Sequence, residues 1–285
     1  MQNSRRTLLK AGLLTAAMTP FMKIEQAMSA VAAELGASAE DAARIAAEAH
    51  QSLHDYPDMN MMGQEEVAMF LYPGMTMLDF VGPQYFFASM MGAKVHLVSA
   101  SDSLEPVMGD TGFAVVPTMA MSDCPTDLDV LFVPGGLYGT VDAMNDTRSV
   151  DFLADRGRRA RYVTSVCTGS LLLGQAGLLE GKKATSHWAT RHLLPEFGAT
   201  AVDQRLVIDG RSITGAGVSA GLDFGLAMLA KLRSEAYART VQLIAEYDPE
   251  PVFHPDDTDP KLRESTQQVF ASSIFAMQQA ARNRR

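Results

Sequence analysis

Cysteine is scarce in this 285-residue chain, which contains only Cys124 and Cys167. Two cysteines exclude a disulfide-stapled scaffold and a zinc site built from four cysteine ligands. Basic residues are outnumbered as well, because 24 Lys and Arg face 33 Asp and Glu and leave a net charge of −9. Non-specific nucleic-acid binding needs a basic surface, so we expect no nucleic-acid partner.

Long apolar runs, internal repeats and low-complexity segments are also missing from the sequence. A membrane helix requires about 20 consecutive apolar residues, so we expect no stable membrane span. The remaining composition, 47% hydrophobic and 20% charged, is that of an ordinary globular chain. A chain of this length can form one well-buried domain with extensions.

The first 30 residues have the order of parts found in an export signal. Residues 4–10 (SRRTLLK) match a twin-arginine motif, residues 11–22 are apolar, and residues 27–30 (AMSA) offer a small-residue cleavage site. The alternative is an amphipathic first helix with a chance arginine pair, which would leave the protein cytoplasmic. We expect residues 1–30 to be a twin-arginine signal peptide and the protein to be exported to the periplasm.

Residues 31–65 are Ala-rich with helical spacing, and we interpret them as an N-terminal extension and linker. Ser38 and Asp41 resemble a capping box and predict a helix start there. A small cluster of imidazole and thioether side chains follows: His50, His54, Met59, Met61 and Met62. Such ligands suit copper. Because methionine is abundant throughout the chain, with 18 residues, we assign no metal.

From Glu66 onward, short apolar runs alternate with helical stretches. The runs are too short and too uniformly apolar for half-exposed strands, which predicts buried strands at residues 67–72, 95–99, 130–133 and 162–166. We expect helices at 83–91, with Pro83 in the first helical position, and at 147–160. Strands alternating with helices indicate parallel βαβ units and therefore an α/β sandwich.

Two hairpins interrupt this alternation. Residues 109–112 (GDTG) separate 105–108 from 113–118, and Asp209-Gly210 separates 205–208 from 211–214. Helices at 219–233 and 234–247 follow, then a Pro/Asp-rich loop at 248–260 and a final helix at 260–282. We therefore assign residues 66–250 to the main domain and residues 251–285 to a C-terminal loop and helix.

Cys167 is the most informative residue of the chain. It stands between the β-branched run 161–166 and the small-residue start of a helix at 168–174, which is the sequence form of a nucleophile elbow. Ser165 and Gly169 flank it at two residues' distance, where a sharp turn needs small side chains. A thiol at a helix N-terminus should ionise more readily than a free one. The alternative is a buried structural cysteine.

Ligands of parallel α/β sheets bind beyond the carboxyl ends of the strands. This rule gathers three motifs into one cleft: the loop after Tyr72, the turn Pro134-Gly135-Gly136, and Cys167. We expect the active site there. Cys124 lies before Pro125 in a loop without an elbow, so we interpret it as a bystander.

Three motifs resemble the DJ-1/PfpI superfamily: residues 129–136 (DVLFVPGG), 165–169 (SVCTG) and 214–224 (TGAGVSAGLDF). Within it, the chain is most similar to the isonitrile hydratase branch, on residues 78–83, 160–170, 184–188 and 241–247. The resemblance covers about residues 66–255. It implies a flavodoxin-like, glutamine-amidotransferase-like sandwich with a mostly parallel sheet and helices on both faces.

The resemblance also implies roles for individual residues. Cys167 would be the nucleophile, and Asp79 would be the general acid/base. Without the resemblance, a helix cap before Pro83 explains Asp79 equally well. Protease-like members carry a histidine directly after the cysteine, but this chain has Thr168 there, so a peptidase would lack its general base.

Backbone groups complete the site that the resemblance implies. We expect the turn at Gly135 and Gly136 and the Thr168 amide to stabilise developing charge, with the Thr168 hydroxyl as a further donor. Residues 215–218, including Gly217 and Val218, are expected to pack over the cysteine. Ala216 stands where we expect glycine in this branch, which puts the range of substrates in doubt.

His187 and Trp188 leave two interpretations open. They either line the pocket and orient substrate or form a structural pair near the sheet edge. An apolar stretch at residues 270–277 would suit a subunit contact in the homodimer that the resemblance implies.

The expected activity is that of an isonitrile hydratase-like lyase, which converts a small isocyanide to an N-substituted formamide without a cofactor. One alternative is another cysteine enzyme of the superfamily, glyoxalase- or amidase-like, that acts on a carbonyl compound. Another is a non-catalytic ligand- or redox-sensing domain. Related sensing domains precede a DNA-binding helix-turn-helix module, but the sequence after Tyr237 contains no pattern of such a module.

Overall fold

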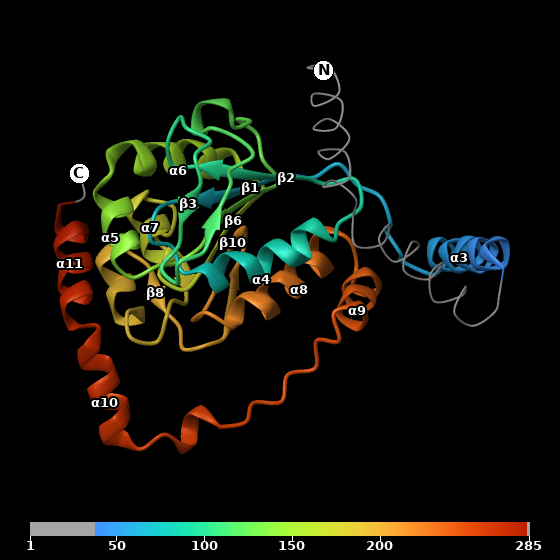
Figure 1. Ribbon diagram of the computed structural model, residues 1–285. Helices are drawn as coiled ribbons and strands as arrows, with labels where there is room; N and C mark the ends of the chain where they lie inside the picture. The colour runs from blue at the N-terminus through green and yellow to red at the C-terminus, as the bar shows by residue number, and fades with distance from the viewer. Residues whose placement is uncertain (1–37, 284–285) are drawn as a thin grey trace, which may run out of the picture.

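A computed structural model describes residues 38–283, and its centre is a six-stranded sheet with the order β2-β1-β5-β6-β10-β9 (Figure 1). The strands are β1 (Glu66–Leu71), β2 (Lys94–Ser99), β5 (Val130–Val133), β6 (Tyr162–Val166), β9 (Leu206–Asp209) and β10 (Ser212–Gly215). All neighbours pair in parallel except β9 and β10, which form the hairpin predicted around Asp209-Gly210. The mostly parallel sandwich predicted from the sequence is confirmed.

The central strands are apolar because both faces of the sheet are covered. All four residues of β5 are buried, and so are five of the six in β1. The crossover from β1 to β2 runs in the opposite direction from the crossover between β5 and β6. Since such crossovers are right-handed, their helices lie on opposite faces of the sheet.

Two groups of helices form the outer layers. One group packs together as α4 (Met77–Ala88), α8 (Ala220–Leu232) and α9 (Glu235–Ile244). The other contains α5 (Tyr138–Asn145), α6 (Thr147–Arg159), α7 (Gly169–Gln175) and α11 (Ala271–Arg282). No helix within residues 38–283 is long and apolar enough to cross a membrane.

The helices after β1 and β5 differ from the prediction. Helix α4 begins at Met77 rather than at Pro83, so the proline lies inside it. Proline lacks an N–H, which removes the hydrogen bond that would otherwise reach the carbonyl of Asp79, four residues earlier. The sequence prediction also missed α5, which follows directly after the Gly135-Gly136 turn.

Short elements complete the domain. The predicted hairpin at residues 109–112 is confirmed, although its strands are only β3 (Val107–Met108) and β4 (Ala114–Val115). A small parallel pair joins β7 (Lys183–Ala184) to β8 (Thr200–Ala201). The 3₁₀ helices in the described part of the chain are η1 (Met121–Asp123), η2 (Arg191–Phe197) and η3 (Pro255–Asp257).

On the N-terminal side, α3 (Ala39–His54) extends away from the sheet (Figure 1). Its N-cap is Ser38, whose side chain accepts a hydrogen bond from the Asp41 amide, as the capping pattern predicts. The twin-arginine motif and its cleavage site lie outside the described residues. Within residues 38–283, no group of three or more His, Cys, Asp and Glu side chains is arranged to hold a metal ion.

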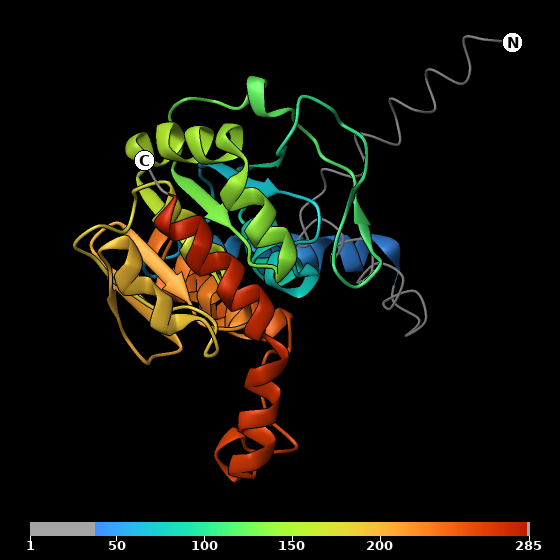
Figure 2. The ribbon, with the colours of Figure 1, turned by 90° about the vertical axis from the view of Figure 1, so that its left-hand side faces the viewer.

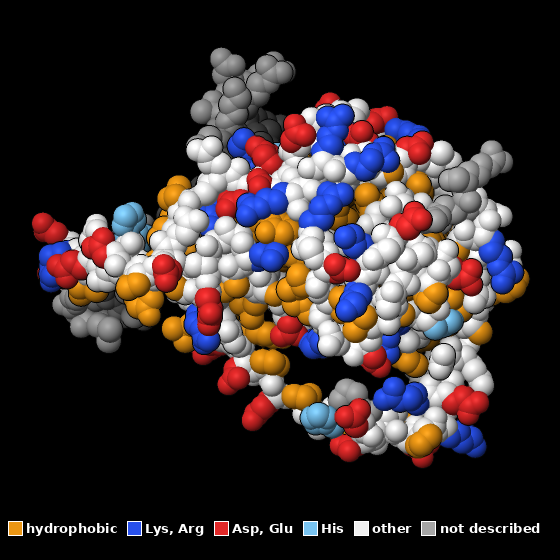
Figure 3. All heavy atoms as spheres, turned by 180° about the vertical axis from the view of Figure 1, so that it is seen from behind, with side chains coloured by type: hydrophobic (Ala, Val, Ile, Leu, Met, Phe, Trp, Pro, Cys, Tyr) orange, Lys and Arg blue, Asp and Glu red, His pale blue; other side chains and the backbone are white. Residues whose placement is uncertain are grey.

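After α9, the chain leaves the body of the protein and returns. Residues 248–259 run clear of the domain along part of their course, and α10 (Pro260–Val269) and α11 bring the chain back to the side of α5 (Figures 1, 2 and 3). The predicted single helix at 260–282 is therefore two helices that meet at Phe270. Of residues 270–277, for which a subunit contact is expected, Met277 is completely buried within this chain and Phe275 is 62% exposed, so the contact stays a prediction.

Candidate active site

Cys167 occupies the sharp turn between β6 and α7. Its φ angle is +59°, a left-handed conformation that is costly for any residue with a side chain. The Cys167 amide donates to the carbonyls of Gly215 (3.1 Å) and Ala216 (2.7 Å), which hold the turn against the end of β10. The nucleophile elbow predicted from the sequence therefore has its expected backbone geometry.

Asp79 lies in the first turn of α4 and is completely buried. Its Oδ2 atom accepts a hydrogen bond of 3.0 Å from the Gly135 amide. Its Oδ1 atom has no hydrogen-bond partner within residues 38–283. Asp79 is therefore not a cap at Pro83 but an acid held between the glycine turn and the cysteine.

Gly135 is glycine because two functional groups approach it closely. A Cβ atom there would lie 2.6 Å from Asp79 Oδ2 and 2.7 Å from Cys167 Cβ. Both distances are shorter than real side chains tolerate. The missing side chain lets the ends of β5 and β6 and the start of α4 meet at one point.

The Asp79 carboxyl has an unusual proton affinity. Burial raises its pKa to about 7, although the interaction with Cys167 and the hydrogen bond from Gly135 both oppose that shift. A carboxyl with a pKa near neutrality can both donate and accept a proton under physiological conditions. The acid/base role expected for Asp79 requires a pKa of this kind and stays a prediction.

The Cys167 thiol differs from the prediction of an easily ionised group. Burial and the nearby Asp79 carboxylate raise its pKa well above the ordinary range, whereas the backbone amides of Thr168 and Val218 lower it. Burial outweighs the favourable amides because the cysteine is only 5% exposed. The Cys167 thiol therefore holds its proton more tightly than the Asp79 carboxyl does.

Thr168 and Gly136 are placed differently from the prediction. The Gly136 amide donates to Thr168 Oγ1 (2.9 Å), so it is not directed at the sulfur. The Thr168 hydroxyl in turn lies 2.6 Å from the Gly136 carbonyl and 2.8 Å from Thr140 Oγ1. Thr168 contributes its backbone amide to the site, while its side chain fastens the elbow to the Gly135-Gly136 turn.

The loop after β10 faces Cys167, as predicted. Its Val218 has a φ angle of +24°, a second strained conformation beside the nucleophile. The Val218 amide is one of the two backbone groups that lower the pKa of the Cys167 thiol. Sequence analysis identified the loop but not the strain at Val218, because positive φ at a β-branched residue has no sequence signature.

His187 and Trp188 line one pocket together with residues 216–219 of this loop. Their rings are 5.7 Å apart, and a Cβ atom on Gly217 would lie 2.7 Å from His187 Cδ2. Burial lowers the pKa of His187, so the ring is neutral at neutral pH. Both rings line a pocket of about 460 Å³ that is bounded on one side by residues 216–219.

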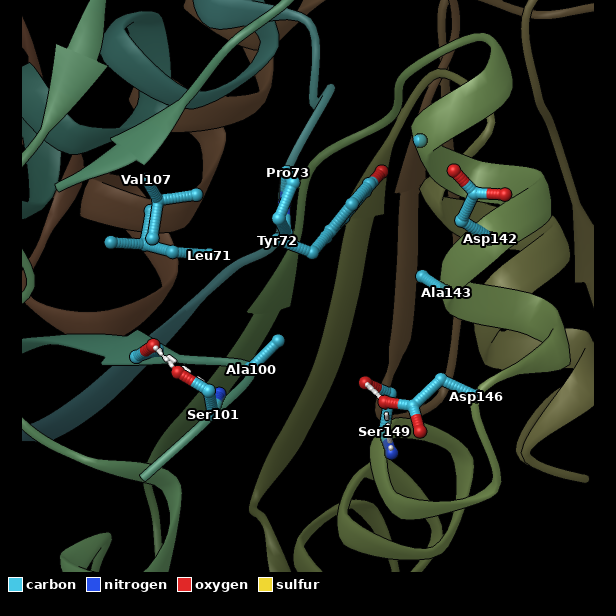
Figure 4. Close-up of a pocket in the computed structure, with 12 residues that line it drawn as sticks. Leu71, Tyr72, Pro73, Ala100, Ser101, Val107, Asp142, Ala143, Asp146 and Ser149 are labelled. Carbon is cyan, nitrogen blue, oxygen red and sulfur yellow. Dashed lines mark hydrogen bonds between the residues drawn. The ribbon is translucent and has the colours of Figure 1, made fainter. Parts of the chain in front are cut away.

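A further pocket of about 320 Å³ lies beyond the carboxyl ends of β1 and β2, beside α5 (Figure 4). Tyr72 forms part of its wall, and the Tyr72 hydroxyl donates to the Pro134 carbonyl (2.8 Å) and bonds Thr140 Oγ1 (3.1 Å). Neither Cys167 nor Asp79 lines this pocket. Tyr72 thus connects the pocket wall to the hydrogen bonds that support the elbow.

Cys124 is buried next to η1 and is distant in sequence from Cys167 and Asp79. Arg156 donates to its backbone carbonyl (2.9 Å), and burial raises the pKa of its thiol. The Arg156 guanidinium lowers this pKa, and the Glu66 carboxylate is the smallest of the causes that raise it. The geometry agrees with the interpretation of Cys124 as a bystander.

The structure thus presents a mostly parallel α/β sandwich with a cysteine on a strained strand-to-helix turn, faced by a buried carboxyl. Residues 65–231 match the DJ-1/PfpI family. The chain belongs to this family. Isonitrile hydratase of Pseudomonas putida is 45% identical over 194 residues, which cover 68% of this chain and 83% of that protein.

Solved structures agree with this assignment. A THiJ/PfpI family protein from Pseudomonas syringae has 49% sequence identity and a TM-score of 0.77, and the match covers 80% of this chain and 94% of that one. Drosophila melanogaster DJ-1beta shares the fold at 21% identity, with a TM-score of 0.59 over 66% of this chain and all of its own.

Proposed function

We propose that this protein hydrates an isocyanide to an N-substituted formamide, with Cys167 as nucleophile and Asp79 as general acid/base. The observation that carries the proposal is the buried Asp79 carboxyl beside Cys167, with one oxygen held by Gly135 and a pKa of about 7. The similarity to the Pseudomonas putida protein named isonitrile hydratase supports the choice of substrate class.

The first step forms the bond between sulfur and substrate. The Asp79 carboxylate first accepts the proton of the Cys167 thiol, and the resulting thiolate attacks the terminal carbon of R–N≡C. The carboxyl transfers its proton to that carbon, which gives the thioimidate Cys–S–CH=N–R and leaves Asp79 as carboxylate. The amides of Thr168 and Val218 stabilise the thiolate before attack.

Water then completes the reaction. Asp79 accepts a proton from the water molecule that adds to the thioimidate carbon and passes a proton to the substrate nitrogen, which gives Cys–S–CH(OH)–NH–R. The carboxylate next removes the hydroxyl proton, the carbon–sulfur bond breaks, and the formamide HC(O)–NH–R departs. Return of the proton from Asp79 to the sulfur restores the thiol and the carboxylate, so the net reaction consumes one isocyanide and one water, as in a hydro-lyase.

The direct test is formamide production from a panel of alkyl and aryl isocyanides, measured for the wild-type protein and Cys167→Ser. We expect turnover by the wild type and a loss of at least about 100-fold in the variant. Cys124→Ala is the matched control and should retain activity. A folded, reduced wild type that produces no formamide from any member of the panel would contradict the proposal.

We propose a homodimer for the same protein. Helix α4, which carries Asp79, exposes Leu78 (47%) and Val81 (45%), and such apolar side chains suit a contact between copies. Sedimentation velocity should give twice the chain mass, and Leu78→Lys with Val81→Glu should shift the protein toward monomer. A wild type that sediments as a monomer at micromolar concentration would contradict this part.

A further inference from the structure

The C-terminal segment approaches the active-site loop from two directions, although it lies beyond the family match, which ends at residue 231. One approach is made by Phe270, where α10 meets α11, and the other by Tyr247, just after α9. Between these two points the chain leaves the body of the protein (Figures 1 and 3). Both approaches end at residues 216–219, the loop that faces Cys167.

The first approach is a stack of rings. Phe270 lies 5.5 Å from His187 and 6.4 Å from Trp188, measured between ring centroids. The Arg263 guanidinium, also from the C-terminal segment, lies 5.8 Å from the centroid of Trp188. Because the His187 ring lies directly against Gly217, Phe270 supports the loop through one intervening side chain.

The second approach is a chain of polar contacts. The Tyr247 hydroxyl donates to Asp223 Oδ1 (2.9 Å), and the other oxygen of Asp223 accepts from Arg205 Nε. Arg205 reaches the loop twice: its guanidinium bonds Ser219 Oγ (3.4 Å), and its carbonyl accepts from the Ala216 amide (2.9 Å).

The loop needs such support because its own packing is incomplete. Residues 216–219 border the pocket of about 460 Å³, so one side of the loop lacks packed neighbours. Val218 within it adopts the strained φ angle of +24°. A strained conformation persists only when the surrounding structure holds it. The rings at Gly217 and the contacts at Ser219 lie on either side of Val218.

We propose that Phe270 and Tyr247 are positioning residues that clasp the loop at Gly217 and Ser219 and so hold the Val218 amide against the Cys167 sulfur. This inference rests on the proposed function only where it implies a change in isocyanide turnover. The stabilisation of the Cys167 thiolate can be measured without an isocyanide. The clasp gives the C-terminal segment a role in reactivity as well as in folding.

The test measures the pH dependence of iodoacetamide alkylation of Cys167 in a Cys124→Ala background. The variants are Phe270→Ala, Tyr247→Phe and the double variant, with Phe275→Ala as control because Phe275 on α11 is 62% exposed. Asp79 is the charged group that faces the sulfur, and it is unchanged in every variant. We expect the apparent pKa of alkylation to rise in the single variants and further in the double variant.

Weakening one hydrogen bond to a charged group should lower the alkylation rate at pH 8 roughly three- to tenfold. The control should follow the parent protein. A lower melting temperature with an unchanged alkylation profile would show that the segment acts only on stability and would overturn the inference. A profile shift without isonitrile turnover by the parent protein would uphold the clasp and refute the proposed function alone.

Discussion

The Gly135 amide holds the Asp79 carboxyl by one oxygen, Oδ2, at 3.0 Å. The other oxygen stays buried without a hydrogen-bond partner in residues 38–283. A buried carboxyl oxygen without a donor favours the protonated acid, since its negative charge is poorly compensated. The Gly135 N–H thereby fixes the orientation of the Asp79 carboxyl, and the carboxyl can still exchange a proton near neutral pH.

Gly135→Ala should disrupt this arrangement. The new methyl group would lie 2.6 Å from Asp79 Oδ2 and 2.7 Å from the Cys167 side chain, so the acid and the nucleophile must separate. We expect turnover to fall at least about 100-fold and stability to fall by about 1–3 kcal/mol, measured by formamide assay and urea unfolding. Gly82→Ala in α4 meets only ordinary contacts and serves as control. Equal effects of both substitutions would contradict the prediction.

Asp79→Asn should make Cys167 more reactive toward iodoacetamide and should lower isocyanide turnover. The Asp79 carboxylate raises the pKa of Cys167, so its removal should let alkylation proceed at lower pH. Turnover should still fall roughly 100-fold or more, because the amide cannot transfer a proton. Parallel iodoacetamide and isonitrile assays separate the two effects. Retained turnover would show that Asp79 is not the acid/base.

The stability of the fold should depend on pH through Asp79. Its pKa is about 7 in the folded protein and near 3.8 when exposed, so between these values the folded state holds a proton that the unfolded state releases. Stability is therefore highest below pH 4 as far as this group is concerned and falls as pH rises to 7. Between pH 5 and pH 8, the free energy of unfolding of Asp79→Asn should rise by about 2–3 kcal/mol relative to that of the wild type.

Urea unfolding at both pH values measures this difference. The exposed Asp142 provides the control, since Asp142→Asn should follow the wild type at both pH values. A pH-independent difference between Asp79→Asn and wild type would mean that the Asp79 carboxyl ionises normally in the folded protein.

Tyr72→Phe tests the hydrogen bonds that support the elbow. The buried hydroxyl joins the Pro134 carbonyl to Thr140, which in turn contacts Thr168. We expect a loss of about 1–2 kcal/mol on urea unfolding, because both partners stay buried. Tyr138→Phe removes the hydroxyl of a 55%-exposed tyrosine and should have little effect. Similar losses in the two variants would argue against a supporting role for Tyr72.

Export is a separate prediction that depends only on residues 1–30. If the twin-arginine motif operates, the protein expressed in a bacterium with that pathway should lose about 30 residues and accumulate in the periplasm. Replacing both arginines, Arg5→Lys with Arg6→Lys, should keep the precursor in the cytoplasm. Mass spectrometry of each fraction measures the outcome, and an uncleaved wild type in the cytoplasm would refute the signal.

The sheet and the elbow were predictable because their signals are local. Uniformly apolar runs identified the central strands, with β5 and β6 predicted to the residue. The small residues around Cys167 predicted its turn. The hairpin at Asp209-Gly210 followed from turn chemistry alone.

Features that depend on distant contacts were not predictable in this way. The start of α4 was misplaced because Pro83 suits a first turn, whereas packing against α8 sustains the helix around it. The break between α10 and α11 at Phe270 contains no glycine or proline that would predict it, and it coincides with the contact between the Phe270 and His187 rings. The high pKa of Cys167 likewise reflects burial by segments far apart in the sequence.

The left-handed backbone at Cys167 has an evolutionary consequence. A conformation with φ of +59° costs about 1–2 kcal/mol for a residue with a side chain, whereas glycine adopts it freely. A Cys167→Gly change would therefore relax the turn while removing the sulfur. Drift toward greater stability and selection for chemistry act in opposite directions on this codon, so an inactive descendant of this protein should be more robust than its reactive ancestor.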